Sequence, residues 1–517
     1  MSNRAQHMFD RAEVCPDKVA IIFEGETYTF ARLAKLVRAA AGGFGTLGIG
    51  KGTRVGIMIP SSPDFIIVQQ ALFALGAIVT PLSIFYHVAE VSHAITSCDL
   101  EYLVIASALQ DRVAIDPESL LDTLRSVILV DDAMAAQHPK AQSLSAATGA
   151  SVPLDRLADV AEDDVVMLLL TSATTGKSKG VMLTASNLAA NYDRTPTWLA
   201  LDSNDVILCA LPLYNTFGLN QCINATLLAG ATLILLPRFD AERCIDAIHD
   251  FKCTFVPAVP TMLQKINDHP RAGNNRLGSI TKILTGGAPV PAALLQRVLA
   301  AAPEAQVLSA YGLTEGTALV TLTPVRLGDN GEVEHGRTIG RVLDGITLEI
   351  MDDNGLVLGP GEVGEIVMRG PNVMRGYHRA PEDTAVALAG GWLHSGDIGY
   401  IDDEGYVFIV DRKKDVIIRG GQNIYPADIE EVIYQVPGVV EVGVVGVSDD
   451  MLGEVPVAFV ALRPGTDVTA ATIHERCASE LARYKIPAQI HFLKELPKGP
   501  TGKILRRELR SLSPTAA

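Results

Sequence analysis

Short apolar runs alternate with helical stretches along the first part of the chain. Residues 54–59 form such a run, and a helical stretch at 64–75 and a second apolar run at 77–81 follow it. The fully apolar run Val165 to Leu170 has the length and composition of a buried strand. Strands that alternate with helices in this way predict a layered α/β body with a substantial parallel sheet.

The pattern changes after Gly340. Segments such as ITLEIMDDNG, GEVGEIVMRG and GYVFIVDRKKD are short strands separated by Asp, Asn and Gly turns, which favours an antiparallel or barrel-like section. A chain of 517 residues is too long for one hydrophobic core. We therefore expect a large N-terminal domain at 1–411 and a small mobile α+β domain at 412–517. The small domain should contain helices at 426–435 and 471–482 and strands at 439–447 and 455–462.

Composition and charge disfavour nucleic-acid-binding and membrane-spanning proteins. The formal net charge of −16 gives no long-range attraction to nucleic acid or to an anionic membrane. No apolar run is long enough for a membrane helix, and the N-terminus has no apolar signal segment. The seven cysteines are scattered without CxxC spacing, as expected for reduced thiols in a cytoplasmic protein. The sequence leaves open whether the chain forms a homodimer.

The loop TSATTGKSKG at 171–180 directly follows the apolar run that ends at Leu170. Small residues let the backbone approach an anion, and hydroxyls and lysines supply donors and positive charge, so the loop suits a polyphosphate. A P-loop is a competing interpretation, because Gly176, Lys177 and Ser178 match the end of its signature. Its first glycine would fall on Thr171, however, and no helix follows at once.

Seven further motifs follow in a fixed order: PLYNTFG at 212–218, GGAP at 286–289, YGLTE at 311–315, GWLHSGD at 391–397, DRKKD at 411–415, GGQNIYP at 420–426 and PKGPTGK at 497–503. Together with the phosphate loop, they resemble the adenylate-forming superfamily, and its acyl-CoA synthetase branch in particular. The resemblance extends from about residue 20 to 510.

The resemblance implies a two-step reaction. A carboxylate attacks the α-phosphate of ATP to give acyl-AMP and pyrophosphate, with Mg²⁺ bound to the nucleotide. A thiol, usually that of coenzyme A, then displaces AMP to form a thioester. Because two anions must meet in the first step, catalysis rests on positioning and charge neutralisation.

The same resemblance implies a set of site residues. Three residues are implied to be catalytic, with Glu315 also the metal ligand: Lys503, Glu315 and Thr314. The nucleotide and coenzyme A are expected to contact Thr171, Ser172, Thr174, Thr175, Gly176, Lys179, Gly287, Ala288, Pro289, Ala310, Tyr311, Gly312, Asp397, Arg412, Gly420 and Gly421. Within this set Asp397 is the implied ribose ligand, and Gly420 and Gly421 the implied pantetheine contacts. Lys414 is the implied hinge of the small domain.

The expected acyl pocket is lined by Asn215, Leu219, Val256, Val259 and Leu313. The lining is mostly apolar, which favours a medium- or long-chain fatty acid first and an aryl acid second. Asn215 stands where acyl-CoA synthetases commonly have histidine, and Ala173 and Ser178 replace a glycine and a proline of the usual phosphate loop. An acyl-AMP ligase that loads an acyl carrier protein is an alternative. A non-catalytic relative is disfavoured, because Lys503 and Glu315 are both present.

Overall fold

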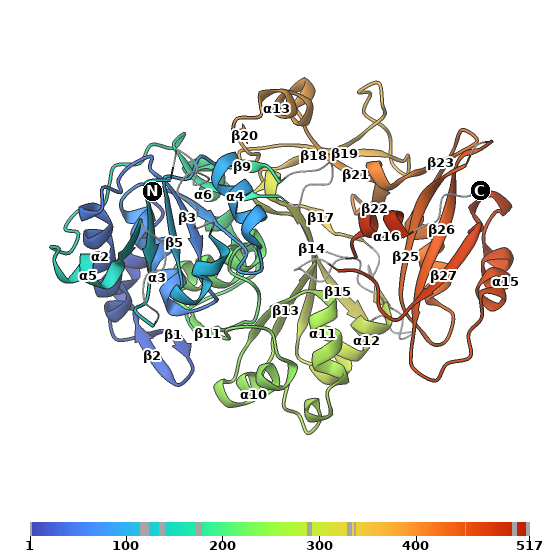
Figure 1. Ribbon diagram of the computed structural model, residues 1–517. Coiled ribbons are helices and arrows are strands. Elements are labelled where there is room, and N and C mark those ends of the chain that lie inside the picture. The colour runs from blue at the N-terminus through green and yellow to red at the C-terminus, as the bar shows by residue number, and fades with distance from the viewer. Residues whose placement is uncertain are drawn as a thin grey trace. The chain divides into compact units, whose positions relative to one another are not determined.

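The computed structural model describes residues 3–113, 124–133, 140–171, 178–286, 292–327, 333–334, 338–449, 451–498 and 504–512. Their contacts divide the chain into two compact units (Figure 1). The first unit contains Met1–Thr347 and Met368–Leu393, and the second contains Leu348–Val367 and His394–Ala517. In the described ranges, no helix combines the length and apolar character needed to cross a bilayer.

A mixed sheet of the first unit carries the phosphate loop. Its strands, in order across the sheet, are β20 (Gly376–Tyr377), β9 (Gly180–Thr184), β8 (Val165–Leu170), β4 (Ile78–Pro81), β3 (Arg54–Met58), β5 (Tyr102–Ile105), β6 (Ser126–Leu129) and β7 (Ala141–Ser143). The pairs from β8 to β7 are parallel, whereas β9 pairs antiparallel with β8 and β20. The predicted strands at 54–59, 77–81 and 165–170 are thereby confirmed.

A second sheet of the first unit is built around six strands that pair in parallel, in this order: β1 (Val19–Phe23), β11 (Thr232–Leu235), β10 (Val206–Cys209), β12 (Phe255–Ala258), β13 (Lys282–Gly286) and β14 (Gln306–Leu313). Antiparallel strands extend the two ends: β2 (Glu26–Thr29), β15 (Ala318–Leu327), β16 (Val333–Glu334) and β17 (Arg341–Val342). The carboxyl ends of β13 and β14 lead into the GGAP and YGLTE motifs.

Helices of the first unit connect these strands: α1 (Gln6–Val14), α2 (Phe30–Thr46), α3 (Pro63–Ala74), α4 (Val88–Ser97), η1 (Ser107–Arg112), α5 (Leu144–Gly149), α6 (Ala185–Asn191), η2 (Tyr192–Arg194), α7 (Thr195–Trp198), α8 (Thr216–Gly218), η3 (Leu219–Asn224), α9 (Ala225–Ala229), α10 (Ala241–Phe251), α11 (Pro260–Asp268), η4 (Pro270–Ala272), α12 (Ala292–Ala301), η5 (Thr314–Gly316), α13 (Pro381–Ala387) and η6 (Ala389–Gly391). Helix α3 is buried on almost every side, and most of its residues are apolar, although Gln69 and Gln70 are buried as well. Helix α6 begins where Thr184 and Asn187 cap each other's backbone.

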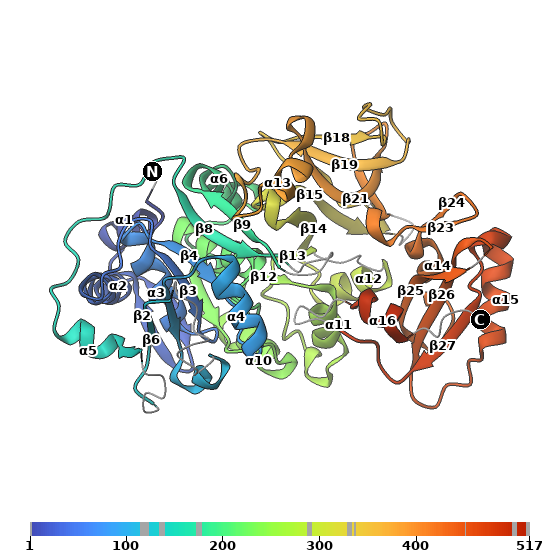
Figure 2. The same ribbon diagram turned by 45° about the horizontal axis from the view of Figure 1, so that its top comes forward.

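The second unit contains two sheets (Figure 2). One has the order β18 (Thr347–Met351), β19 (Gly364–Arg369), β21 (Leu393–Ile401) and β22 (Val407–Arg412). The other has the order β24 (Gln422–Ile424), β23 (Ile417–Arg419), β26 (Gly453–Leu462) and β25 (Val439–Asp449), with β27 (Gln489–Leu493) parallel to β26.

The helices of the second unit are η7 (Lys413–Asp415), α14 (Pro426–Tyr434), α15 (Ala470–Glu480), η8 (Arg483–Lys485) and α16 (Arg506–Leu512). Apolar side chains of α14 and α15 bury one face of β25 and β26, and Leu509 of α16 packs among residues of the other face. The predicted helices and strands after residue 426 are thus present, and the α/β fold class is confirmed.

Candidate active site

The predicted phosphate loop lies in the sequence between two strands that pair antiparallel, β8 and β9. Leu170 at the end of β8 pairs with Gly180 at the start of β9, and the Thr171 N–H donates to the Lys179 carbonyl over 3.2 Å. The other predicted phosphate contacts, Ser172, Thr174, Thr175 and Gly176, lie outside the described residues, as does Ala173. A strand therefore follows the loop where a P-loop requires a helix, and the P-loop interpretation is wrong.

Lys179 has two neighbours that the sequence did not predict. Its ammonium forms an ion pair with Asp383 in the first turn of α13, and it lies 5.3 Å from the centre of the Tyr377 ring. Tyr377 belongs to β20, whose pairing with β9 brings it beside Lys179. The lysine is partly buried, whereas Asp383 is half exposed.

Glu315 and Thr314 lie on the tight turn η5 between β14 and β15. The turn closes through a hydrogen bond from the Thr317 N–H to the Thr314 carbonyl, and Thr317 has a left-handed φ of 57°. Only glycine fits at Gly312, because a Cβ there would lie 1.5 Å from the carbonyl oxygen of Ala318. This close approach of two strands fixes where the Glu315 carboxylate emerges.

The Glu315 carboxylate accepts a hydrogen bond of 2.9 Å from the Tyr377 hydroxyl. Burial, and then the charge of Glu315, raise the pKa of Tyr377 well above its usual value, so the hydroxyl remains a donor at neutral pH. The backbone supports the same contact, since the Met374 N–H donates to the Glu315 carbonyl over 2.8 Å. Lys179, Tyr377 and Glu315 thus form one contiguous group.

The predicted nucleotide contacts Ala310 and Tyr311 are buried on β14, beside β13. Gly286, the last residue of β13, pairs with Ala310. Gly287, Ala288 and Pro289 lie outside the described residues.

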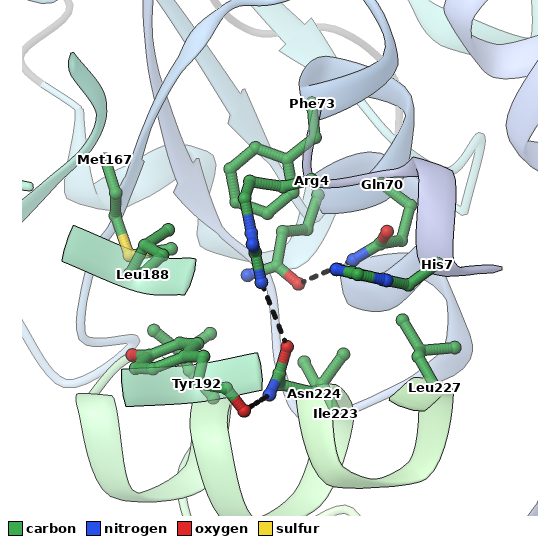
Figure 3. A pocket seen from close by; sticks show the side chains of 12 residues that line it. Arg4, His7, Gln70, Phe73, Met167, Leu188, Tyr192, Ile223, Asn224 and Leu227 are labelled. Atoms are coloured by element: carbon green, nitrogen blue, oxygen red, sulfur yellow. Dashed lines mark hydrogen bonds between the residues drawn. The ribbon is translucent and has the colours of Figure 1, made fainter. Parts of the chain in front are cut away.

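The predicted acyl-pocket residues lie in several different surroundings. Asn215 caps α8 by accepting from the Gly218 N–H over 3.0 Å. Leu219 lines a cavity of about 20 Å³, which Figure 3 shows with Arg4, Tyr192 and Asn224 around it. Such a volume holds about one water molecule.

Val256 lines a second, apolar cavity of about 10 Å³ beneath α10 to α12. Val259 precedes α11, and Leu313 ends β14. Leu219 and Val256 therefore line two different cavities.

Gln221 is a polar side chain that the sequence reasoning missed. It lies on η3, which is a π-helical segment, and it is fully buried. Within the described residues, neither its Oε1 nor its Nε2 has a hydrogen-bond partner. Gln221 is not among the residues that line the cavity of Figure 3.

In the second unit, Asp397 and Arg412 are cross-strand partners on β21 and β22. The Arg412 Nε lies 3.1 Å from the Asp397 Oδ1, and the Asp397 side chain is almost fully buried. The two residues predicted to act together on the ribose are thus adjacent.

Gly420 and Gly421 form the two-residue turn between β23 and β24, with φ of 57° and 81°. Two consecutive left-handed residues make a turn that suits glycine. Lys414 lies in η7, where burial lowers its pKa and Asp415 opposes that effect. It belongs to the second unit, and its role as a hinge stays a prediction.

Arg506 is the centre of an ionic cluster in the second unit. Its guanidinium contacts both oxygens of Glu430 at 2.8 and 2.9 Å, and also Asp411 at 3.1 Å and Asp415 at 3.4 Å. Burial works against the charge of Arg506, but the three carboxylates outweigh it and raise its pKa. The cluster joins η7, α14 and α16; α16 begins three residues after Lys503, which itself lies outside the described residues.

The sequence matches the family described as AMP-binding enzyme over residues 8–378. The chain belongs to that family. The C-terminal domain of AMP-binding enzymes matches over residues 428–503, so the two matches together span most of the chain.

Relatives support the reaction class. The chain is 34% identical to 4-coumarate–CoA ligase 2 of Oryza sativa subsp. japonica, over 98% of this chain and 91% of that protein. It is 32% identical to a long-chain-fatty-acid–CoA ligase of Bacillus subtilis (strain 168), over 97% and 92%. The structure of ATP-bound MatB from Rhodopseudomonas palustris superposes with a TM-score of 0.89 at 30% identity, over 99% and 98%. The protein is an ATP-dependent, AMP-forming acid–CoA ligase.

The described residues of the ligase fit a magnesium–nucleotide complex. In this part of the chain, Glu315 Oε2 has no hydrogen-bond or ion-pair partner, whereas Oε1 is held by Tyr377. No three His, Cys, Asp or Glu side chains gather there as a metal site of protein ligands alone. One carboxylate oxygen completed by phosphate oxygens and water is the coordination that Mg²⁺ favours in such enzymes.

Proposed function

We propose that this ligase activates an aromatic acid with a polar ring substituent, first as its acyl-AMP and then as its CoA thioester. The observation that carries the substrate class is the buried Gln221 amide, whose two polar atoms lack partners in the described chain. A buried polar group without a hydrogen bond costs about 1–3 kcal/mol, and a ligand with a matching hydroxyl or carbonyl recovers that cost. The rice relative, named for 4-coumarate, supports the same class.

We assign the adenylation step to residues that the ordered motifs supply. Lys179 neutralises the outer phosphates, Thr314 contacts the α-phosphate, and Glu315 holds Mg²⁺ when the nucleotide is bound. Lys503 bridges the substrate carboxylate and the α-phosphate, an assignment that rests on the motif PKGPTGK. Asp397, braced by Arg412, accepts from the ribose hydroxyls. The positive charges of Lys179, Lys503 and Mg²⁺ would offset the repulsion between the substrate carboxylate and the nucleotide.

We assign the thioester step to coenzyme A and the turn Gly420-Gly421. The turn carries no side chains, so a narrow pantetheine arm can lie along its backbone. A carrier protein offers the same arm. Parallel assays with CoA and with a loaded carrier protein distinguish the acceptors, since rapid transfer to the carrier alone would contradict the CoA assignment.

A substrate panel tests the proposed acid. Acid-dependent pyrophosphate release is measured for cinnamic acid, its 4-hydroxy derivative and a series of saturated fatty acids. We expect the hydroxylated acid to have the highest kcat/KM. Replacement of Gln221 by Leu should reduce its preference over cinnamic acid by at least about 10-fold, because the bond to the substituent is lost.

Gln70 provides the matched control. It is also a buried glutamine of the first unit, with its Oε1 unpartnered in the described chain, and it lines the cavity of Figure 3. Gln70→Leu removes a buried amide but should leave the preference between the two acids unchanged. Equal preference shifts in both variants would contradict the role of Gln221.

A fatty acid is the second candidate. It is favoured by the apolar character of four predicted pocket residues: Leu219, Val256, Val259 and Leu313. A rise of kcat/KM with chain length, together with slow turnover of both cinnamic acids, would establish this alternative and overturn the first.

A further inference from the structure

One tyrosine contacts both charged groups that the proposed function places at the polyphosphate. The Tyr377 hydroxyl donates to Glu315 Oε1 over 2.9 Å, and its ring lies beneath the Lys179 ammonium at 5.3 Å. Glu315 is 62 residues away in sequence, so the contact is a product of the fold. Tyr377 is held in turn by its pairing with Val181 of β9 and by a 2.9 Å bond from its N–H to the Thr384 hydroxyl.

The hydrogen bond from the Tyr377 hydroxyl occupies one of the two oxygens of the Glu315 carboxylate. Because Oε1 is engaged, rotation of the Glu315 carboxylate is restricted and Oε2 is left for a cation. Hydrogen bonds of this kind orient a metal-binding carboxylate before the ion arrives.

The ring has a separate effect on Lys179. The alternative partner, Asp383, is half exposed, and ion pairs with exposed partners contribute little to stability. The lysine can therefore leave Asp383 at small cost when a phosphate is offered, while the aromatic face keeps the ammonium beside Glu315.

We propose that Tyr377 is a positioning residue, which orients Glu315 through its hydroxyl and Lys179 through its ring for the magnesium–nucleotide complex. This inference rests on the roles given above to Glu315 and Lys179. It assigns no proton transfer to the tyrosine.

Equilibrium binding of ATP, titrated calorimetrically at several Mg²⁺ concentrations, tests the inference without turnover. Tyr377→Phe keeps the ring and removes only the hydroxyl. We expect it to need about 10- to 100-fold more Mg²⁺ for half-maximal tightening of ATP binding. Binding of ATP in EDTA should be unchanged, because Lys179 keeps its neighbour. Tyr377→Leu also removes the ring and should weaken binding in EDTA by about 2- to 5-fold.

Tyr28 supplies a closely matched control in the same unit. Its hydroxyl donates to a carboxylate, Glu26, over 3.0 Å, and a cation, Arg32, lies 4.0 Å from its ring centre. Tyr28→Phe makes the same chemical change on β2 and should leave the Mg²⁺ requirement unaltered. A purely structural role for Tyr377 would lower the melting temperature while leaving Mg²⁺ dependence intact, and that result would overturn the inference.

The variant Glu315→Gln distinguishes the positioning role of Tyr377 from the metal-binding role of Glu315, on which it rests. If this variant retains normal Mg²⁺ dependence, the metal role of Glu315 is wrong. If it loses that dependence and Tyr377→Phe does not, only the positioning role fails. When both assignments hold, the double variant requires no more Mg²⁺ than Glu315→Gln alone.

Discussion

At the scale of single residues, Asp193 stabilises the N-terminal segment of the chain. Its carboxylate accepts from Arg4 and from His7 Nε2, the latter over 3.2 Å, and so connects η2 with α1. Burial disfavours its charge, but the hydrogen bonds from His7 and Arg4 and the charge of Arg4 outweigh burial and lower the pKa of Asp193 to about 2.

This lowered pKa predicts how stability depends on acid. The usual pKa of an aspartate is about 3.9, so the difference corresponds to about 2–3 kcal/mol at neutral pH. Because the folded pKa lies below the unfolded one, the contribution is complete above about pH 4 and is lost as pH falls towards 2. Asp193→Asn should remove it and flatten the acid limb of a urea-unfolding series.

Asp17→Asn is the control for that series. Asp17 is exposed, and the described structure gives it no ion pair. Its replacement should change the free energy of unfolding by less than about 0.5 kcal/mol. An acid limb as steep in Asp193→Asn as in the parent would contradict the prediction.

At the scale of elements, the Arg506 cluster fixes the helix that follows the segment of Lys503. The strand bridge between Lys498 and Ile504 and the bond from the Leu505 N–H to the Pro497 carbonyl join the residues on either side of that segment. Lys498 also forms an ion pair with Glu441. The segment that carries the proposed catalytic lysine therefore begins and ends at fixed points.

Arg506→Ala should destabilise the ligase by about 3–5 kcal/mol, because it leaves Glu430 and Asp411 without their cation, whereas Asp415 keeps Arg510. Denaturant unfolding of the full chain, followed by a probe of the second unit, measures the loss. Arg507 is exposed on the same helix, and Arg507→Ala should have an effect below about 0.5 kcal/mol. Equal effects of the two variants would mean that the cluster contributes no specific stability.

At the scale of the whole molecule, the proposed function requires the small domain to change position between its two steps. Proline at Lys414 restricts φ in η7, where such a change is predicted to occur. Lys414→Pro should form acyl-AMP but slow the transfer of the acyl group to CoA. Single-turnover assays of each half-reaction measure the two effects, and unimpaired thioester formation would contradict the hinge assignment.

The fold was predictable where the signal was local. The strand Val165–Leu170 is an uninterrupted apolar run, and the structure has it at the same residues. Ordered motifs likewise pointed to Glu315 and Asp397. Tyr377 had no such signal, because its contact with Glu315 depends on the pairing of β20 with β9. Nor could the sequence reveal that the Gln221 amide is buried without partners, since that depends on every surrounding side chain.

The predicted domain boundary at residue 411 separates a large domain from a small domain that is expected to move, and it stays a prediction. Contacts group the chain differently, since Leu348–Val367 belongs with His394–Ala517, and Met368–Leu393 returns to the first unit. The chain passes from one unit to the other within β18, β19 and β21.

That returning segment has a consequence for biosynthesis. The ribosome adds Tyr377 62 positions after Glu315, so at about 5–20 residues per second the delay is roughly 3–12 s. Throughout that interval the nascent first unit lacks β20, and its edge strand β9 has no partner on that side. The group of Glu315 and Tyr377, to which we assign the polyphosphate, is therefore completed late in translation, after most of the sheet that supports it has already been made.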